Sequence, residues 1–187
     1  MKRNIGVTPD EILAAPDAAL AALMRLGGIM PAQRAERLRS IALAVKRECH
    51  GDLRATLSRR MRADTQHPDV GVRDAKRLLQ QFPTIGEPGA EKILLFARLA
   101  PVAAVPSAFV AVPVRLWHGE TGSSYSADYR RGREILSRGV PESFAVRQRA
   151  YMLLKAHGRD ICKRAAPRCE VCPVTGQCAY LRARAAD

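Results

Sequence analysis

Acidic residues are scarce in this chain of 187 residues. It carries 18 Asp and Glu against 31 Lys and Arg, which gives a formal net charge of +13 and an isoelectric point near 10.3. A pI this high in a compact domain is the usual electrostatic footprint of a nucleic-acid-binding protein. The charge alone also permits an acidic protein partner or a membrane surface. Arginine makes up most of the excess, and its planar guanidinium suits phosphate better than lysine does.

Long apolar runs are absent as well. No segment approaches the roughly 20 apolar residues that span a bilayer, and the basic N-terminus is not followed by the apolar stretch of a secretory signal. We therefore expect no membrane partner and a cytoplasmic, nucleoid-associated location, in which thiols stay reduced. A hydrophobic fraction of 47% is sufficient for a core, and we expect a monomer.

Alternating strand patterns, internal repeats and low-complexity segments are also lacking, and the periodicity is helical nearly throughout. Thr8, Pro9 and Glu11 form a typical helix start, with a cap, a first-turn proline and an acid three residues after the cap. The fold class we predict is all-α. The helical segments are expected at 8–28, 31–49, 73–82, 90–100, 126–139 and 141–162, with a buried, broken helix over 101–116.

Cysteine is rare, yet four of the five cysteines fall in the last 26 residues. They are spaced C-x6-C-x2-C-x5-C at Cys162, Cys169, Cys172 and Cys178. In a reducing compartment four such thiols are more typical of metal ligands than of disulfides. Tetrahedral zinc is one candidate. However, only one C-x2-C pair is present, and the asymmetric loop favours a [4Fe-4S] cluster. Cys49 is interpreted as a small packing residue.

At this point a family resemblance becomes visible. The cysteine loop with its preceding "HGRDIC", the segment "FPTIGEPGAEKILLFA" and the segment "VPSAFVAVPVRL" resemble three motifs of endonuclease III-type DNA glycosylases. The likeness covers roughly residues 10 to 182. It implies a helical barrel lobe over 8–135 containing a helix-hairpin-helix at 74–99, and a cluster lobe over 136–187 with its loop at 162–178, packed as one unit. The chain begins close to the first matching segment, so the barrel is expected to be incomplete at its front.

A helix-hairpin-helix binds double-stranded DNA through backbone N–H groups at a helix N-terminus, without reading the base sequence. "PTIGEPG" supplies glycines for a close approach to a phosphate, although Thr84 stands where the family has a glycine. The cluster loop adds basic residues beside the metal. The residues we expect to contact DNA are Thr84, Gly86, Gly89, Lys92, Lys163, Arg164 and Arg168.

The resemblance fails at the catalytic positions. The family's nucleophilic lysine aligns with Pro88 and its aspartate with Pro106, and neither proline can replace them. The nearby ionisable residues are Lys92 on the following turn and four acids, Glu87, Glu91, Glu120 and Asp128, the last of which is expected in a loop. The leading hypothesis is therefore a DNA-binding protein related to base-excision repair glycosylases that lacks the usual lyase chemistry. The alternatives are an active, divergent DNA glycosylase that removes damaged bases from duplex DNA, and a protein-binding module in which the cluster only stabilises the fold.

Overall fold

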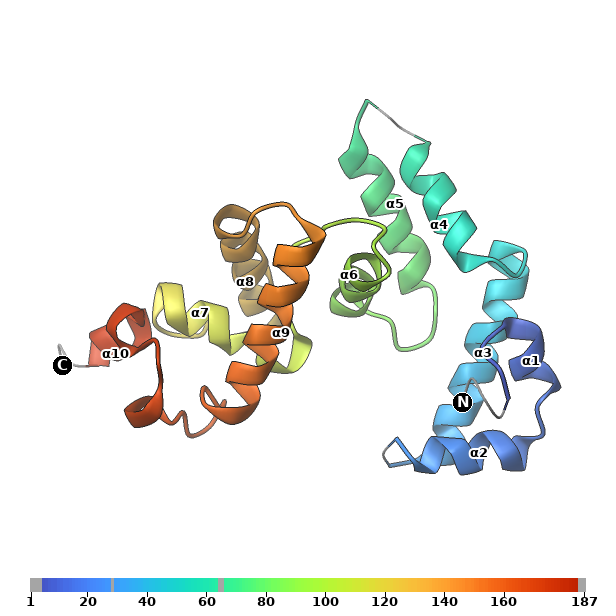
Figure 1. Ribbon diagram of the computed structural model, residues 1–187, viewed down its shortest axis with the longest axis horizontal. Coiled ribbons are helices and arrows are strands. Elements are labelled where there is room, and N and C mark those ends of the chain that lie inside the picture. Colours follow the sequence, from blue (N-terminus) through green and yellow to red (C-terminus); the bar gives the residue numbers. More distant parts are fainter. Residues whose placement is uncertain (1–4, 28, 64–65, 185–187) are drawn as a thin grey trace. The chain divides into compact units, whose positions relative to one another are not determined.

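A computed structural model describes residues 5–27, 29–63 and 66–184. The chain divides into two compact units, Met1–Gly86 (unit 1) and Glu87–Asp187 (unit 2), which are described separately below. No strand occurs in the part of the chain that the structure describes, and every regular element is helical (Figure 1). The predicted all-α class is confirmed. None of the helices in these ranges is long and apolar enough to cross a membrane. The lobes expected at 8–135 and 136–187 stay a prediction.

Five helices lie in the residues of unit 1 that the structure describes. They are α1 (Pro9–Ala14), α2 (Asp17–Arg25), α3 (Pro31–Cys49), α4 (Leu53–Arg62) and α5 (Pro68–Gln80). Helices α1 and α2 pack against α3, and α4 packs against α5 (Figure 1). Thr8 begins α1 with the predicted capping box, in which its hydroxyl and the Glu11 carboxylate each accept from the other's backbone N–H. Asp52 caps α4 by accepting the N–H of Ala55 at 2.8 Å.

The interior of unit 1 is aliphatic. Leu20, Leu57, Leu78 and Leu79 are almost fully buried. Cys49 is 1% exposed at the end of α3, which confirms that it is a packing residue. Helix α4 was not expected from the sequence, because its arginine-rich segment has no clear apolar stripe.

Unit 2 is arranged around α9. Its elements are α6 (Glu87–Phe96), the short 3-10 helix η1 (Ser107–Phe109), α7 (Ala111–His118), α8 (Tyr125–Gly139), α9 (Phe144–Asp160), the 3-10 turns η2 (Cys169–Val171) and η3 (Thr175–Gln177), and α10 (Ala179–Arg184). Helix α9 contacts α6, η1 and α7, while α7 also contacts α8 and α10 (Figure 1). The broken helix expected over 101–116 is an irregular segment followed by η1 and α7.

One glycine fixes how η1 lies on α9. A Cβ atom added to Gly158 would come within 2.5 Å of the Phe109 ring, so only glycine lets this ring reach the helix backbone. Gly158 is buried two residues before the end of α9. This contact therefore positions η1 beside the end of α9, from which the cysteine loop departs.

Candidate functional site

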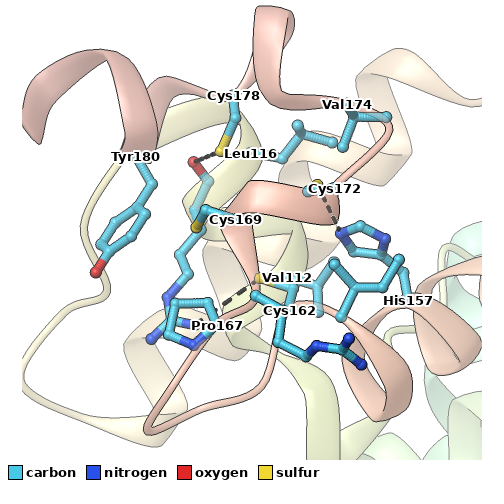
Figure 2. A pocket seen from close by; sticks show the side chains of 13 residues that line it. Val112, Leu116, His157, Cys162, Pro167, Cys169, Cys172, Val174, Cys178 and Tyr180 are labelled. Atoms are coloured by element: carbon cyan, nitrogen blue, oxygen red, sulfur yellow. Dashed lines mark hydrogen bonds between the residues drawn. The ribbon is translucent and has the colours of Figure 1, made fainter. Parts of the chain in front are cut away.

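The four C-terminal cysteines line one cavity in unit 2 (Figure 2). Cys162 follows the end of α9, Cys169 and Cys172 bracket η2, and Cys178 caps η3. Short backbone bonds fold the loop: the N–H of Cys172 donates to Cys169 O at 3.2 Å, and that of Cys178 donates to Thr175 O at 3.1 Å. Residues separated by 16 positions in sequence are thus brought to one site by local turns.

Arg115, at the end of α7, connects this loop to the rest of unit 2. The side chain is 8% exposed. Its Nη1 donates to the carbonyl of Lys163 at 2.8 Å and lies 3.8 Å from the Sγ of Cys162, and its Nη2 donates to the carbonyl of Arg164 at 2.7 Å. Its guanidinium also lies 5.1 Å from the centre of the Tyr180 ring. This residue was not predicted from the sequence, in which the only signal was an arginine inside the apolar segment "VPVRL".

Two further contacts reach the thiols. The Nε2 of His157 lies 3.8 Å from the Sγ of Cys172, and the Sγ of Cys178 donates to the Arg115 carbonyl at 3.8 Å (Figure 2). Burial raises the pKa of Cys169, and the neighbouring cysteines raise it further when they are ionised. The Cys169 thiol is therefore close enough to the other three cysteines to interact with them electrostatically.

The donor set can be compared with the group that the loop is expected to hold. In kind and number, four thiols around one cavity match the ligands of a [4Fe-4S] cluster. The match does not extend to the arrangement of the side chains. Among residues 5–27, 29–63 and 66–184, no group of three or more Cys, His, Asp or Glu side chains is arranged to hold a metal ion.

The expected DNA-contacting residues fall in both units. Thr84 and Gly86 are exposed in the turn that ends unit 1, and Gly89 and Lys92 lie on α6 in unit 2, half-buried and exposed respectively. Lys163, Arg164 and Arg168 are exposed on the cysteine loop. The turn itself is closed by the N–H of Ile85, which donates to Phe82 O at 3.2 Å.

Thr84 has a φ of 67°, a left-handed conformation that disfavours a β-branched residue. The strain lowers the free energy of unfolding by roughly 1–2 kcal/mol. Glycine would avoid this strain, but it would lower the free energy of unfolding by about 0.5–1 kcal/mol because its unfolded chain has the greater conformational entropy. We expect Thr84→Gly to raise the free energy of unfolding by about 0.5–1 kcal/mol in urea melts. Thr84→Val keeps the branching and should bring no gain. An equal gain from valine would show that the backbone conformation is not responsible.

The two prolines that the resemblance aligns with the family's lysine and aspartate have ordinary structural roles. Pro88 is half-buried in the first turn of α6, and Pro106 is buried immediately before η1. Glu91 is 2% exposed, accepts a hydrogen bond from the Tyr129 hydroxyl and lies 3.2 Å from Nε of Arg133. Burial, followed by the charge of Glu91, raises the pKa of Tyr129 far above its usual value. Tyr129 therefore remains protonated and holds the carboxylate in place.

Asp128 lies in the first turn of α8, so its expected placement in a loop was wrong. It is 6% exposed, and its Oδ1 accepts the N–H of Gly122 at 2.6 Å. Its side chain lines a polar cavity of about 320 Å³ together with Ser107, Ser124 and Arg164. Since Ser107 directly follows Pro106, the cavity adjoins the proline that the resemblance aligns with the family's aspartate.

The chain resembles known proteins in its overall structure rather than in its overall sequence. No family model and no curated protein matches the sequence. Solved structures do match: endonuclease III trapped covalently on DNA in an estranged-adenine complex has a TM-score of 0.64 at 19% identity, covering 95% of this chain and 71% of that one. The chain has the fold of endonuclease III.

Two further solved structures support this fold. A non-covalent endonuclease III–DNA complex has a TM-score of 0.64 at 19% identity, with 96% of this chain and 72% of that chain covered. A thermostable thymine-DNA glycosylase has a TM-score of 0.65 at 20% identity, covering 94% and 70%. The expectation of a DNA-glycosylase-like helical fold is thus confirmed.

Proposed function

We propose that this protein is a [4Fe-4S] protein that binds double-stranded DNA and is related to base-excision repair glycosylases of the endonuclease III type, but lacks their lyase chemistry. The observation that carries the proposal is the convergence of four cysteines on one cavity, next to an exposed basic loop, in a chain of this fold. We further propose that it acts as a monomer in the cytoplasm, on nucleoid DNA.

In this proposal Cys162, Cys169, Cys172 and Cys178 hold the cluster. When bound, the cluster cross-links the loop through four metal–thiolate bonds and supplies no step of a reaction. Arg115 also holds the loop in place, because it donates hydrogen bonds to the carbonyls of the two residues that follow Cys162. The loop then presents three exposed cations, Lys163, Arg164 and Arg168, to DNA phosphates.

The hairpin supplies the second proposed contact. The first turn of α6 leaves backbone N–H groups without helical partners, and these suit a phosphate oxygen. Pro88 has no N–H, so it removes none of the intrahelical bonds there. Thr84 and Gly86 precede this turn, and the Lys92 ammonium is exposed one turn further on. Contacts of this kind bind DNA of any sequence.

The absence of lyase chemistry follows from the groups at hand. A Schiff-base mechanism needs a primary amine at the sugar carbon, and proline at position 88 offers neither an amine nor a titratable side chain. Glu91 cannot substitute for the missing aspartate without breaking its bonds to Tyr129 and Arg133. A buried carboxylate that lost both partners would be strongly disfavoured.

Asp128 favours the second candidate, an active and divergent DNA glycosylase. Its carboxylate lines a cavity beside residue 107, and a carboxylate near the sugar can stabilise the positive charge that develops when a base leaves. In this candidate Asp128 replaces the family's aspartate, and water rather than an amine attacks the sugar.

DNA binding is tested by fluorescence anisotropy with a labelled duplex of 20 base pairs over a range of KCl concentrations. Phosphate contacts predict a linear fall of log Kobs with log[KCl], with a slope near −0.9 for each contact. Five to seven contacts would give a slope between about −4.5 and −6.3. Salt-independent binding, or no binding, would contradict the proposal.

Catalysis is tested in single turnover, with cluster-loaded protein in excess over duplexes that carry an abasic site or an oxidised pyrimidine. Half of each sample is treated with alkali, which reveals base removal without strand cleavage. We expect no cleavage of the untreated samples. Product that appears only after alkali, and that Asp128→Asn abolishes while Glu120→Gln does not, would establish the glycosylase instead. Cleavage without alkali would point to an amine, for which Lys92 is the first residue to replace.

A further inference from the structure

Helix α4 carries four arginines, at 54, 59, 60 and 62, and no acidic residue between Leu53 and Arg62. Its buried side is formed by Thr56 and Leu57. At 3.6 residues per turn, Arg54, Arg62 and Arg59 lie within an arc of about 140° on the opposite side, and all three are exposed. These three arginines are called the arginine face. The other residues on this arc are Ala55 and Ser58, so no large side chain separates the guanidinium groups.

The helix that carries the arginine face is held at a short distance from α5. A Cβ atom at Gly71 of α5 would lie 2.6 Å from the carbonyl oxygen of Met61 and 2.8 Å from its Cα, so the two backbones approach as closely as glycine allows. Leu57 and Leu78 are each 1% exposed in the adjoining core. The last turn of α4, with Arg59 and Arg62, is therefore fixed on the first half of α5.

The same helix α5 ends at the hairpin turn. From Gly71 to Gln80 it rises by about 14 Å at 1.5 Å per residue, and the turn over 82–86 follows directly. The last turn of α4, with Arg59 and Arg62, and the hairpin turn thus belong to one compact unit and lie roughly 15–20 Å apart along α5. At 3.4 Å per base pair this corresponds to about four to six base pairs.

We propose that the arginine face binds the phosphate backbone of duplex DNA, with Arg59 and Arg62 about four to six base pairs from the turn over 82–86 of the same unit. The inference rests on the proposed DNA-binding function and extends it to a helix that the family resemblance does not assign to DNA. Arginine forks suit phosphate oxygens. Protein partners, in contrast, are usually anchored by buried aromatic or large apolar side chains, and the arginine face presents only Ala55 and Ser58 between its arginines.

The test compares two double variants that remove the same charge from unit 1. Arg59→Ala/Arg62→Ala deletes two members of the arginine face, and Arg37→Ala/Arg47→Ala removes two exposed arginines from α3. Each is titrated against an undamaged duplex of 30 base pairs between 50 and 250 mM KCl, and circular dichroism verifies the fold. We expect the first variant to lose about 1.8 units of salt slope, from two phosphate contacts, and the second to lose less than half of that.

Each other outcome has a definite meaning. If wild-type protein binds DNA and both doubles lose the same slope, or neither loses any, the arginine face is not a phosphate site although the proposed function stands. If polyglutamate of matched charge competes as well as unlabelled DNA, the surface is a general acid-binding surface and the inference is wrong. If wild-type protein does not bind DNA at all, the proposed function itself fails.

Discussion

Replacement of Arg115 by leucine is expected to lower the free energy of unfolding by about 3–5 kcal/mol, because it removes two hydrogen bonds from a charged donor and each contributes about 1.5–3 kcal/mol. The side chain is 8% exposed and donates to the carbonyls of Lys163 and Arg164. Leucine fills similar space but leaves both carbonyls without their donor, and each unpaired group costs about 1–3 kcal/mol. It also removes the cation from beside the Tyr180 ring.

This result is measured by urea melts followed by circular dichroism. Two controls separate charge from geometry. Arg115→Lys keeps the charge but cannot bond both carbonyls with a planar fork, so it should recover less than half of the lost stability. Arg149→Leu removes an exposed arginine of α9 and should change the stability by no more than about 0.5 kcal/mol. A leucine variant as stable as wild type would show that Arg115 does not fix the loop.

Cys169→Ser is expected to remove the brown colour of the cluster-loaded protein and lower its melting temperature by about 10 °C or more. Metal binding contributes directly to folding when the site forms only in the folded chain. For a chain of this size a shift of 10 °C corresponds to roughly 3–5 kcal/mol. Cys169 begins η2 in the centre of the loop, so its loss affects the turns on both sides.

Cys49→Ser is the matched control for this prediction. Cys49 is also a buried thiol, but it lies at the end of α3 in unit 1. Its replacement should leave the visible absorbance of the cluster-loaded protein unchanged and cost no more than about 1–3 kcal/mol for a buried hydroxyl. If a colourless Cys169→Ser protein folded and bound DNA normally, the structural role of the cluster would be wrong. If Cys49→Ser also lost the colour, the ligand assignment would need revision.

Local patterns accounted for the fold class and for the cysteine loop. The capping box at Thr8 and the helical periodicity of the apolar residues are short-range properties, and both are found in the structure. The cysteine spacing is short-range as well, because its four members are joined by turns of a few residues. The turn at Thr84 was located correctly, but its left-handed φ appears only in the structure. Helix α4 was missed because Arg54, Arg59, Arg60 and Arg62 obscure its narrow apolar side.

The sequence by itself determined the helical class and the composition of the proposed ligand set, while the alignment of Pro88 and Pro106 with the family's lysine and aspartate stays a prediction. Only the tertiary structure decided which side chains contact the cysteine loop and Glu91. Arg115 meets the loop across 47 to 49 positions, and Tyr129 meets Glu91 across 38. At such separations, the packing of the helices decides which partner a buried polar side chain has. The sequence around the side chain does not specify it, because any donor or acceptor of suitable length could form the bond. Packing alone therefore made Glu91 a structural carboxylate and left Asp128 facing a cavity.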